Sequence, residues 1–136
     1  MTQYVIDAGA IVALLDKRDR HHDWARSVFS DITSAITCDP VLTEAYFLLG
    51  RIGAGDALSR LLERGVFGSI FTTGDELVRI VALMRKFKDV PMSFADACLV
   101  RITEIEHDSR IVTTDSDFLV YRRHARQIVP IVAPFK

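Results

Sequence analysis

The 136-residue chain lacks several features that would set it apart from ordinary globular proteins. Its two cysteines, Cys38 and Cys98, have neither a Cys-x-x-Cys spacing nor a nearby histidine pair, which argues against a disulfide framework and against a zinc site. No apolar run is long enough to span a membrane, and no charged segment followed by an apolar one resembles a signal peptide. We therefore expect a cytoplasmic protein with two buried, reduced thiols and no membrane association.

Neither sign of charge dominates the chain. Its 17 lysines and arginines face 18 aspartates and glutamates, and proteins that coat nucleic acid are usually more basic. Hydrophobic residues make up 49 % of the sequence, which is enough to build a core and argues against disorder. Length and the absence of a linker, repeat or low-complexity segment predict one domain over residues 1–136.

Short apolar segments alternate with segments of helical period along the whole chain. This alternation predicts an α/β fold, a three-layer α/β/α sandwich with a central parallel sheet. Asp39 and Pro40 are expected as the N-cap and first residue of a helix. The expected strands cover residues 3–7, 35–38, 66–71, 111–114 and 128–132, and the expected helices cover 8–15, 24–32, 40–52, 55–64, 75–86 and 94–107.

Four acidic residues lie at the polar edges of these elements. Asp7 and Asp115 directly follow strands, and the carboxyl ends of parallel strands share one edge of a sheet, although each could simply cap the next helix. Glu44 lies in the second helical turn among apolar neighbours, too deep for a cap, although its stem could cover the core with the carboxylate exposed. Asp96, three residues after Ser93, equally fits a capping pair.

Together the four acids predict a metal site. None of them has a lysine or arginine adjacent in sequence, so their charges would repel one another unless some stay protonated or a cation binds. Carboxylates without cysteine or paired histidine favour Mg²⁺ or Mn²⁺ over zinc. Such sites usually serve phosphate chemistry.

Three local motifs occur in a fixed order: Val5-Ile-Asp-Ala-Gly-Ala-Ile-Val-Ala-Leu-Leu15, Met92-Ser-Phe-Ala-Asp-Ala97 and Thr113-Thr-Asp-Ser-Asp-Phe118. With Glu44 between the first two, this set resembles the PIN-domain family, most of all the small bacterial VapC-type toxin ribonucleases. The likeness covers essentially the whole chain. It implies a Rossmann-like sandwich, a Mg²⁺- or Mn²⁺-dependent endoribonuclease acting on RNA, a homodimer, and an antitoxin protein that blocks the acidic pocket.

The resemblance also implies roles for individual residues. Thr113 falls where the family often has a supporting hydroxyl, whereas Ala8 and Gly9 stand where many relatives carry serine, threonine or asparagine. As a hypothesis, Glu44 orients or deprotonates the attacking water, and cleavage leaves a 5′-phosphate and a 3′-hydroxyl. The implied catalytic quartet is Asp7, Glu44, Asp96 and Asp115, and the implied metal ligands are Asp7, Asp96 and Asp115, with Asp117 in an outer or second-metal role.

Several alternatives stay open at this stage. His21 and His22 are rival acid–base groups. The apolar helices over residues 41–49 and 58–62 either pack into the core or form a dimer or antitoxin face. Three basic clusters either bind RNA phosphates or are solvated charges: Lys17, Arg18 and Arg20; Arg85, Lys86 and Lys88; Arg122, Arg123 and Arg126.

Other functions are also possible for such a chain. An aspartate-nucleophile phosphatase wants a second aspartate two residues after the first, where Gly9 stands, and a phosphotransfer receiver has no need of Glu44. A PIN-domain nuclease of RNA processing without a toxin role, or a non-catalytic RNA- or protein-binding module, would share the fold.

Overall fold

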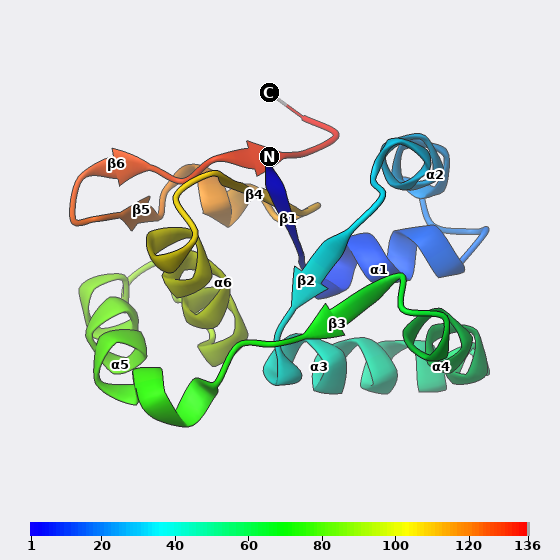
Figure 1. The fold of residues 1–136 in the computed structure, drawn as a ribbon, viewed down its shortest axis with the longest axis horizontal. Coiled ribbons are helices and arrows are strands. Elements are labelled where there is room, and N and C mark those ends of the chain that lie inside the picture. The colour runs from blue at the N-terminus through cyan, green and yellow to red at the C-terminus, as the bar shows by residue number, and fades with distance from the viewer. Residues whose placement is uncertain (136) are drawn as a thin grey trace.

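A computed structural model describes residues 1–135, and a parallel sheet forms their centre (Figure 1). Within these residues the sheet has five strands in the order β3-β2-β1-β4-β7. The predicted strands are therefore confirmed in place, with ends shifted by a few residues. Their bounds are β1 Gln3–Ile6, β2 Ala35–Thr37, β3 Phe67–Ser69, β4 Ser109–Val112 and β7 Ile131–Val132.

Strand β1 lies in the middle of the sheet. Its Val5 is opposite Ile36 of β2 on one side and Ile111 of β4 on the other, and all three side chains are buried. Such unbroken apolar runs are typical of parallel strands covered on both faces. The Asp7 amide donates to the Val112 carbonyl at 3.0 Å, which extends the β1–β4 pairing and brings the ends of these two strands together.

Helices cover the sheet in the three-layer arrangement that the sequence predicts. Figure 1 shows α5 and α6 on one side of the sheet and α2 and α4 on the other, while α3 packs on both α1 and α6. None of the helices in residues 1–135 has the length and apolar character of a membrane span. The bounds are α1 Ala8–Leu15, α2 His22–Asp31, α3 Asp39–Gly50, α4 Gly55–Glu63, α5 Leu77–Lys86 and α6 Phe94–Ile105.

The start of α3 differs from the prediction. Cys38, not Asp39, is the N-cap, and Asp39 is the first helical residue. The Asp39 carboxylate is drawn to the neighbouring strand end instead, where the Ser69 hydroxyl donates to it at 2.5 Å. Cys38 and Cys98 are both buried and unbridged, as the sequence predicts.

The segment after β4 holds elements that the sequence analysis missed. A 3₁₀ turn, η2 (Ser116–Leu119), leads into a hairpin of β5 (Arg122–Arg123) and β6 (Gln127–Ile128). Strands of two residues are too short to show a period. The predicted strand 128–132 is therefore wrong at its start, because Ile128 belongs to the hairpin and only Ile131–Val132 joins the main sheet.

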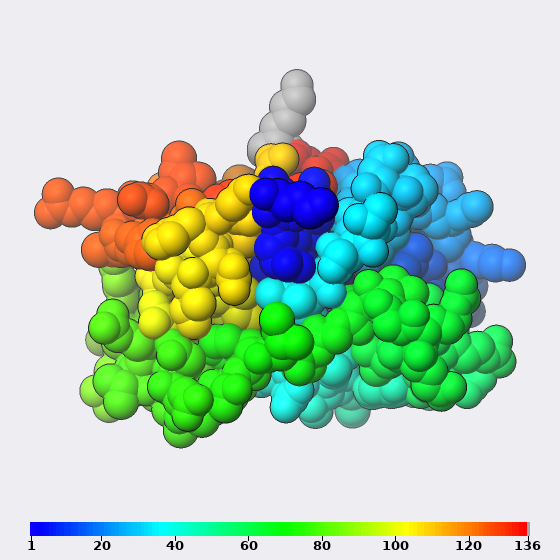
Figure 2. Space-filling model, in the orientation of Figure 1, coloured from blue at the N-terminus to red at the C-terminus, as the bar shows by residue number. Residues whose placement is uncertain are grey.

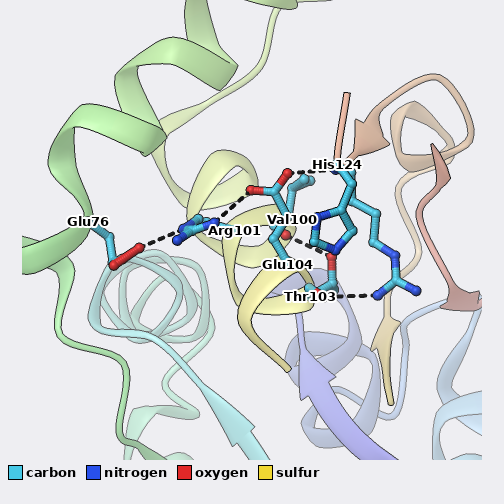
Figure 3. A network of polar contacts seen from close by, with 7 residues as sticks. Glu76, Val100, Arg101, Thr103, Glu104 and His124 are labelled. Atoms are coloured by element: carbon cyan, nitrogen blue, oxygen red, sulfur yellow. Dashed lines mark hydrogen bonds and ion pairs between the residues drawn. The ribbon is translucent and has the colours of Figure 1, made fainter. Parts of the chain in front are cut away.

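A polar network ties α6 to its neighbours (Figure 3). Arg101 of α6 donates to Glu76 of the 3₁₀ turn η1 (Thr73–Glu76) at 2.6 Å and to Glu104 at 3.2 Å. Glu104 in turn accepts from the His124 amide of the hairpin at 2.7 Å. This network joins η1 and the hairpin to the helix that carries Asp96.

The residues just before β1 and just before β4 also meet. Thr2 donates to Asp108 at 2.9 Å, just before β4 begins. Figure 2 shows the first residues (blue) lying between the end of α6 (yellow) and the segment that leads into β2 (cyan). The opposite edge of the sheet, at the carboxyl ends of β1 and β4, is where the acidic residues gather.

Candidate active site

Asp7 is the most constrained of the acids. It is the N-cap of α1 and only 6 % exposed. Its Oδ1 accepts from the Ala8 amide at 2.7 Å, and its Oδ2 accepts from the Thr113 hydroxyl at 2.6 Å. Burial raises the pKa of Asp7 to about 7 against the Thr113 hydrogen bond, and the charges of Asp96 and Glu44 add to the rise. The capping interpretation is thus correct, and it leaves the carboxylate among other acids.

Thr113 links the first strand end to the closing motif. It is fully buried, and its hydroxyl donates to Asp7 while accepting from the Asp115 amide at 3.0 Å. Asp115 is the N-cap of η2, where its Oδ1 accepts from the Asp117 amide at 2.9 Å. The resemblance implies a supporting hydroxyl at Thr113, and in the structure this hydroxyl donates to the Asp7 carboxylate.

Asp96 enters the site from the first turn of α6. A capping box holds it: the Ser93 hydroxyl accepts from the Asp96 amide, and the Asp96 Oδ2 accepts from the Ser93 amide at 3.2 Å. The Tyr121 hydroxyl donates to the same Oδ2 at 3.1 Å. Burial raises the pKa of Asp96, the hydrogen bonds from Ser93 and Tyr121 work against this, and the charge of Asp115 adds to it.

Glu44 is exposed, so the alternative with a solvated carboxylate is the one that the structure adopts. The buried stripe of α3 runs through Val41, Ala45 and Leu49, one position round the helix from Glu44. Partial burial nevertheless raises the pKa of Glu44, and the charges of Asp96 and Asp115 raise it further. Its carboxylate therefore lies close enough to both acids to repel them.

The four acids come from four separate segments and influence one another in pairs. The charges of Asp96 and Glu44 raise the pKa of Asp7, and the charge of Asp115 raises the pKa of Asp96. Asp117 lies nearby, since its charge helps to raise the pKa of Tyr121, after burial and the effects of Asp96. None of the ion pairs found within residues 1–135 involves any of these five acids. Within the described part of the chain, no ion pair therefore compensates this negative charge.

The donor set fits a hard divalent cation in kind, because it offers carboxylate oxygens and neither sulfur nor imidazole. As the side chains stand, no three histidine, cysteine, aspartate or glutamate side chains of residues 1–135 are arranged so that they would already hold a metal ion. Binding would therefore draw the carboxylates closer together, which makes the residues that orient each carboxylate important.

Comparison with known proteins decides the family. The family model of the PIN domain matches residues 4–124. This chain belongs to the PIN-domain family. A search of curated proteins gives no match. Among solved structures, this PIN domain is similar to Mycobacterium tuberculosis VapC20, described as a sarcin–ricin loop cleaving toxin, with a TM-score of 0.74 and 19 % identity over 84 % of this chain and 91 % of that one.

Gly9 of the first motif lies against Thr114 of the closing motif in this PIN domain. A Cβ atom at Gly9 would collide with the Thr114 hydroxyl of the closing motif. Any side chain at residue 9 would therefore require the Thr114 hydroxyl to move. A second aspartate at this position, as a phosphatase of the rival class would carry, would meet the same Thr114 side chain.

His21 and His22 lie away from the acidic site of the PIN domain. His22 is held by a 2.8 Å hydrogen bond between its Nδ1 and the Ala13 carbonyl, in the half of α1 remote from Asp7. His21 packs edge-on against Trp24. The geometry therefore gives no support to an acid–base role for this pair.

Two of the candidate RNA-binding arginines are occupied by the fold. Arg122 donates to the carbonyls of three preceding residues, and Arg123 donates to the carbonyls of Thr103 and His107 near the end of α6. Lys86 donates to the Ala125 carbonyl at the tip of the hairpin. These contacts hold the hairpin in place and leave Arg126 as the exposed arginine of its cluster.

The sequence analysis missed Tyr121. It lies four residues after Asp117 with no motif around it that marks a polar role, so its contact with Asp96 became visible only in the folded chain.

Proposed function

We propose that this PIN domain is a metal-dependent endoribonuclease and the toxin of a type II toxin–antitoxin pair. The observation that carries the proposal is the group of carboxylates held at the carboxyl edge of the sheet, which no ion pair within residues 1–135 neutralises and whose charges raise one another's pKa. Membership of the PIN family and the similarity of fold to VapC20 support it. The whole of residues 1–136 is proposed to act as one domain in the cytoplasm.

Asp7, Asp96 and Asp115 are proposed to hold Mg²⁺ or Mn²⁺, with Asp117 in an outer or second-metal position. When bound, such an ion supplies positive charge to the scissile phosphate and to the leaving oxygen. Thr113 keeps Asp7 in place, and the turn at Asp115 keeps that carboxylate at the start of η2.

Glu44 is proposed to orient and deprotonate the attacking water. Its exposure lets water reach the carboxylate, and its raised pKa makes it a better proton acceptor than an ordinary glutamate. The water oxygen forms the new bond to phosphorus, and the bond from phosphorus to the 3′-oxygen breaks. The products are a 5′-phosphate and a 3′-hydroxyl, which takes up a proton from solvent.

RNA has to be held beside these acids by positive charge. Arg85, Lys88 and Arg126 are exposed in the part of the chain that the structure describes, and so are Lys17 and Arg20. Phosphate contacts by such side chains make binding weaker as the salt concentration rises. We propose these five residues as the candidates for RNA contact. Arg122, Arg123 and Lys86 are left out because they donate to backbone carbonyls, and Arg18 because it pairs with Asp16.

Exposed apolar side chains are proposed to serve partners. Phe47 of α3 is 67 % exposed, although Val41, Ala45 and Leu49 of the same helix pack into the core. A second copy of the chain or an antitoxin helix would remove such a side chain from water. One face of α3 therefore packs into the core, and we propose that a partner covers the face that carries Phe47.

The test is the Asp7→Asn variant with metal titration. The parent should release RNA fragments with Mg²⁺ or Mn²⁺ and lose this activity in EDTA. The cleavage rate of Asp7→Asn should fall by more than about 100-fold, because a loss of about 10–100-fold is typical of residues that only hydrogen-bond a metal ligand. Asp56→Asn, in an exposed ion pair with Arg60 on α4, is the matched control and should behave as the parent. Cleavage by Asp7→Asn at the parent rate would contradict the proposal.

The toxin role needs its own measurement. Expression of the parent in a bacterial host should arrest growth, and expression of Asp7→Asn should not. An active ribonuclease that leaves growth unchanged would favour RNA processing over a toxin role.

A further inference from the structure

Tyr121 is fully buried and held by two aromatic rings. Phe118 meets it edge-on with ring centres 5.1 Å apart, and Phe87 does so at 5.5 Å. Edge-to-face pairs of this kind restrict the rotation of the ring. The hydroxyl is therefore delivered to one place, between the Asp96 carboxylate at 3.1 Å and the more distant Pro91 carbonyl at 3.4 Å.

The two oxygens of Asp96 have different surroundings. Oδ2 accepts from both the Ser93 amide and the Tyr121 hydroxyl. Within residues 1–135 no hydrogen bond reaches Oδ1. A carboxylate has room for about four hydrogen bonds, so the fold uses one side of Asp96 and leaves the other side to something else.

We propose that Tyr121 is a positioning residue of the acidic site: its hydroxyl holds Asp96 by Oδ2 and so leaves Oδ1 for the divalent cation. This inference rests on the proposed function. The Thr113 hydroxyl holds Asp7 in the same way, by donating to its Oδ2. The closing segment from residue 113 to 121 would then supply one hydroxyl to each of two acids that come from other parts of the chain.

The need for such a tether follows from charge. Asp96 is half-buried beside Asp115 and Glu44, and repulsion between like charges favours swinging one carboxylate away towards solvent. Without Tyr121, Ser93 would be the one residue to restrain this side chain, which has two rotatable bonds. A second donor from a rigid ring fixes the carboxylate plane as well as its position.

The deciding variant is Tyr121→Phe, which removes the hydroxyl and keeps the ring and its aromatic contacts. Mn²⁺ binding is measured by calorimetry without RNA, together with the Mn²⁺ concentration that gives half-maximal cleavage. In Tyr121→Phe the Mn²⁺ dissociation constant and the half-maximal Mn²⁺ concentration should both rise about tenfold or more, and saturating Mn²⁺ should restore much of the rate. The melting temperature in EDTA should fall by only about 2–6 °C, since one hydrogen bond is lost.

Two further variants separate positioning from stability. Tyr46→Phe removes a hydroxyl that bonds Ser59 on α4, and it should leave Mn²⁺ binding unchanged. Ser93→Ala removes the hydroxyl that caps α6 but keeps the Tyr121 contact. It should lower the melting temperature at least as much as Tyr121→Phe while weakening Mn²⁺ binding less.

Unchanged Mn²⁺ binding by Tyr121→Phe overturns the inference while leaving the proposed function intact. The inference is also overturned if Ser93→Ala and Tyr121→Phe lose Mn²⁺ affinity in proportion to their loss of melting temperature, because the effect would then be one of stability. A parent protein that neither binds Mn²⁺ nor cleaves RNA overturns the proposed function, and this inference with it.

Discussion

Thr113 and Asp7 are joined by a buried hydrogen bond of 2.6 Å across a sequence separation of 106 residues. The pairing of β1 with β4 makes this contact possible, because it places the residue after each strand at the same edge of the sheet. The hydroxyl lowers the cost of a charge on Asp7 at a place where burial raises it. The strand pairing of the fold thus positions the hydroxyl that supports Asp7 in its proposed role as a metal ligand.

Replacing Thr113 by valine should weaken metal-dependent cleavage by about 10–100-fold, the range typical of residues that hydrogen-bond a metal ligand. Without the hydroxyl the pKa of Asp7 rises further, so the carboxylate is protonated at a higher pH. Thr113→Ser keeps the hydroxyl and should retain most of the activity. Equal rates for the valine and serine variants would show that the hydroxyl is not needed.

Asp7 should make the metal-free protein less stable as the pH rises. Its pKa is about 7 in the folded chain against an ordinary value of 3.8, so the folded state binds more protons between these limits. The free energy of unfolding in EDTA should therefore decline from pH ~4 to ~7 and then level off. Asp7→Asn removes this decline and should be more stable than the parent at pH 8, by about 1–3 kcal/mol. Urea unfolding at several pH values measures both, and parallel pH profiles for the two proteins would contradict the prediction.

Gly9 and Thr114 should show strong coupling. Gly9→Ala should destabilise by about 1–3 kcal/mol, because the added methyl meets the Thr114 hydroxyl, even though alanine favours a helix. Thr114→Ala removes that obstacle, so the double variant should recover most of the loss. A double-mutant cycle from thermal unfolding measures the coupling. Additive effects would mean that the two residues do not compete for the same space.

Arg101 should matter more for stability than an exposed arginine on the surface. Its side chain is 18 % exposed and paired with both Glu76 and Glu104, so Arg101→Met leaves two carboxylates without their partner. A loss of about 2–4 kcal/mol is expected from the cost of breaking a largely buried pair. Arg60→Met breaks an exposed pair with Asp56 and should cost at most about 0.5 kcal/mol. Similar losses in the two variants would argue against the network shown in Figure 3 as a structural clamp.

Features that depend on neighbours in sequence could be predicted from the sequence alone. The alternation of apolar strands and helical periods indicates a parallel α/β sandwich, and the Ser93–Asp96 pair forms the capping box that its spacing suggests. The order of the acidic motifs identifies the segments that should meet. These predictions succeed because hydrophobic period and helix capping are largely local properties of the chain. The N-cap predicted at Asp39 is the exception, since that carboxylate accepts from Ser69, which is distant in sequence.

Only the tertiary structure decided the contacts between distant segments. The pairing of Tyr121 with Asp96, the fit of Thr114 against Gly9 and the use of Arg123 to cap α6 all join residues whose separation in sequence says nothing about their distance in space. Side-chain direction on a helix is another such property. Glu44 has apolar neighbours at helical spacing, yet it is exposed, because the core contacts only one stripe of α3 and Glu44 lies beside that stripe.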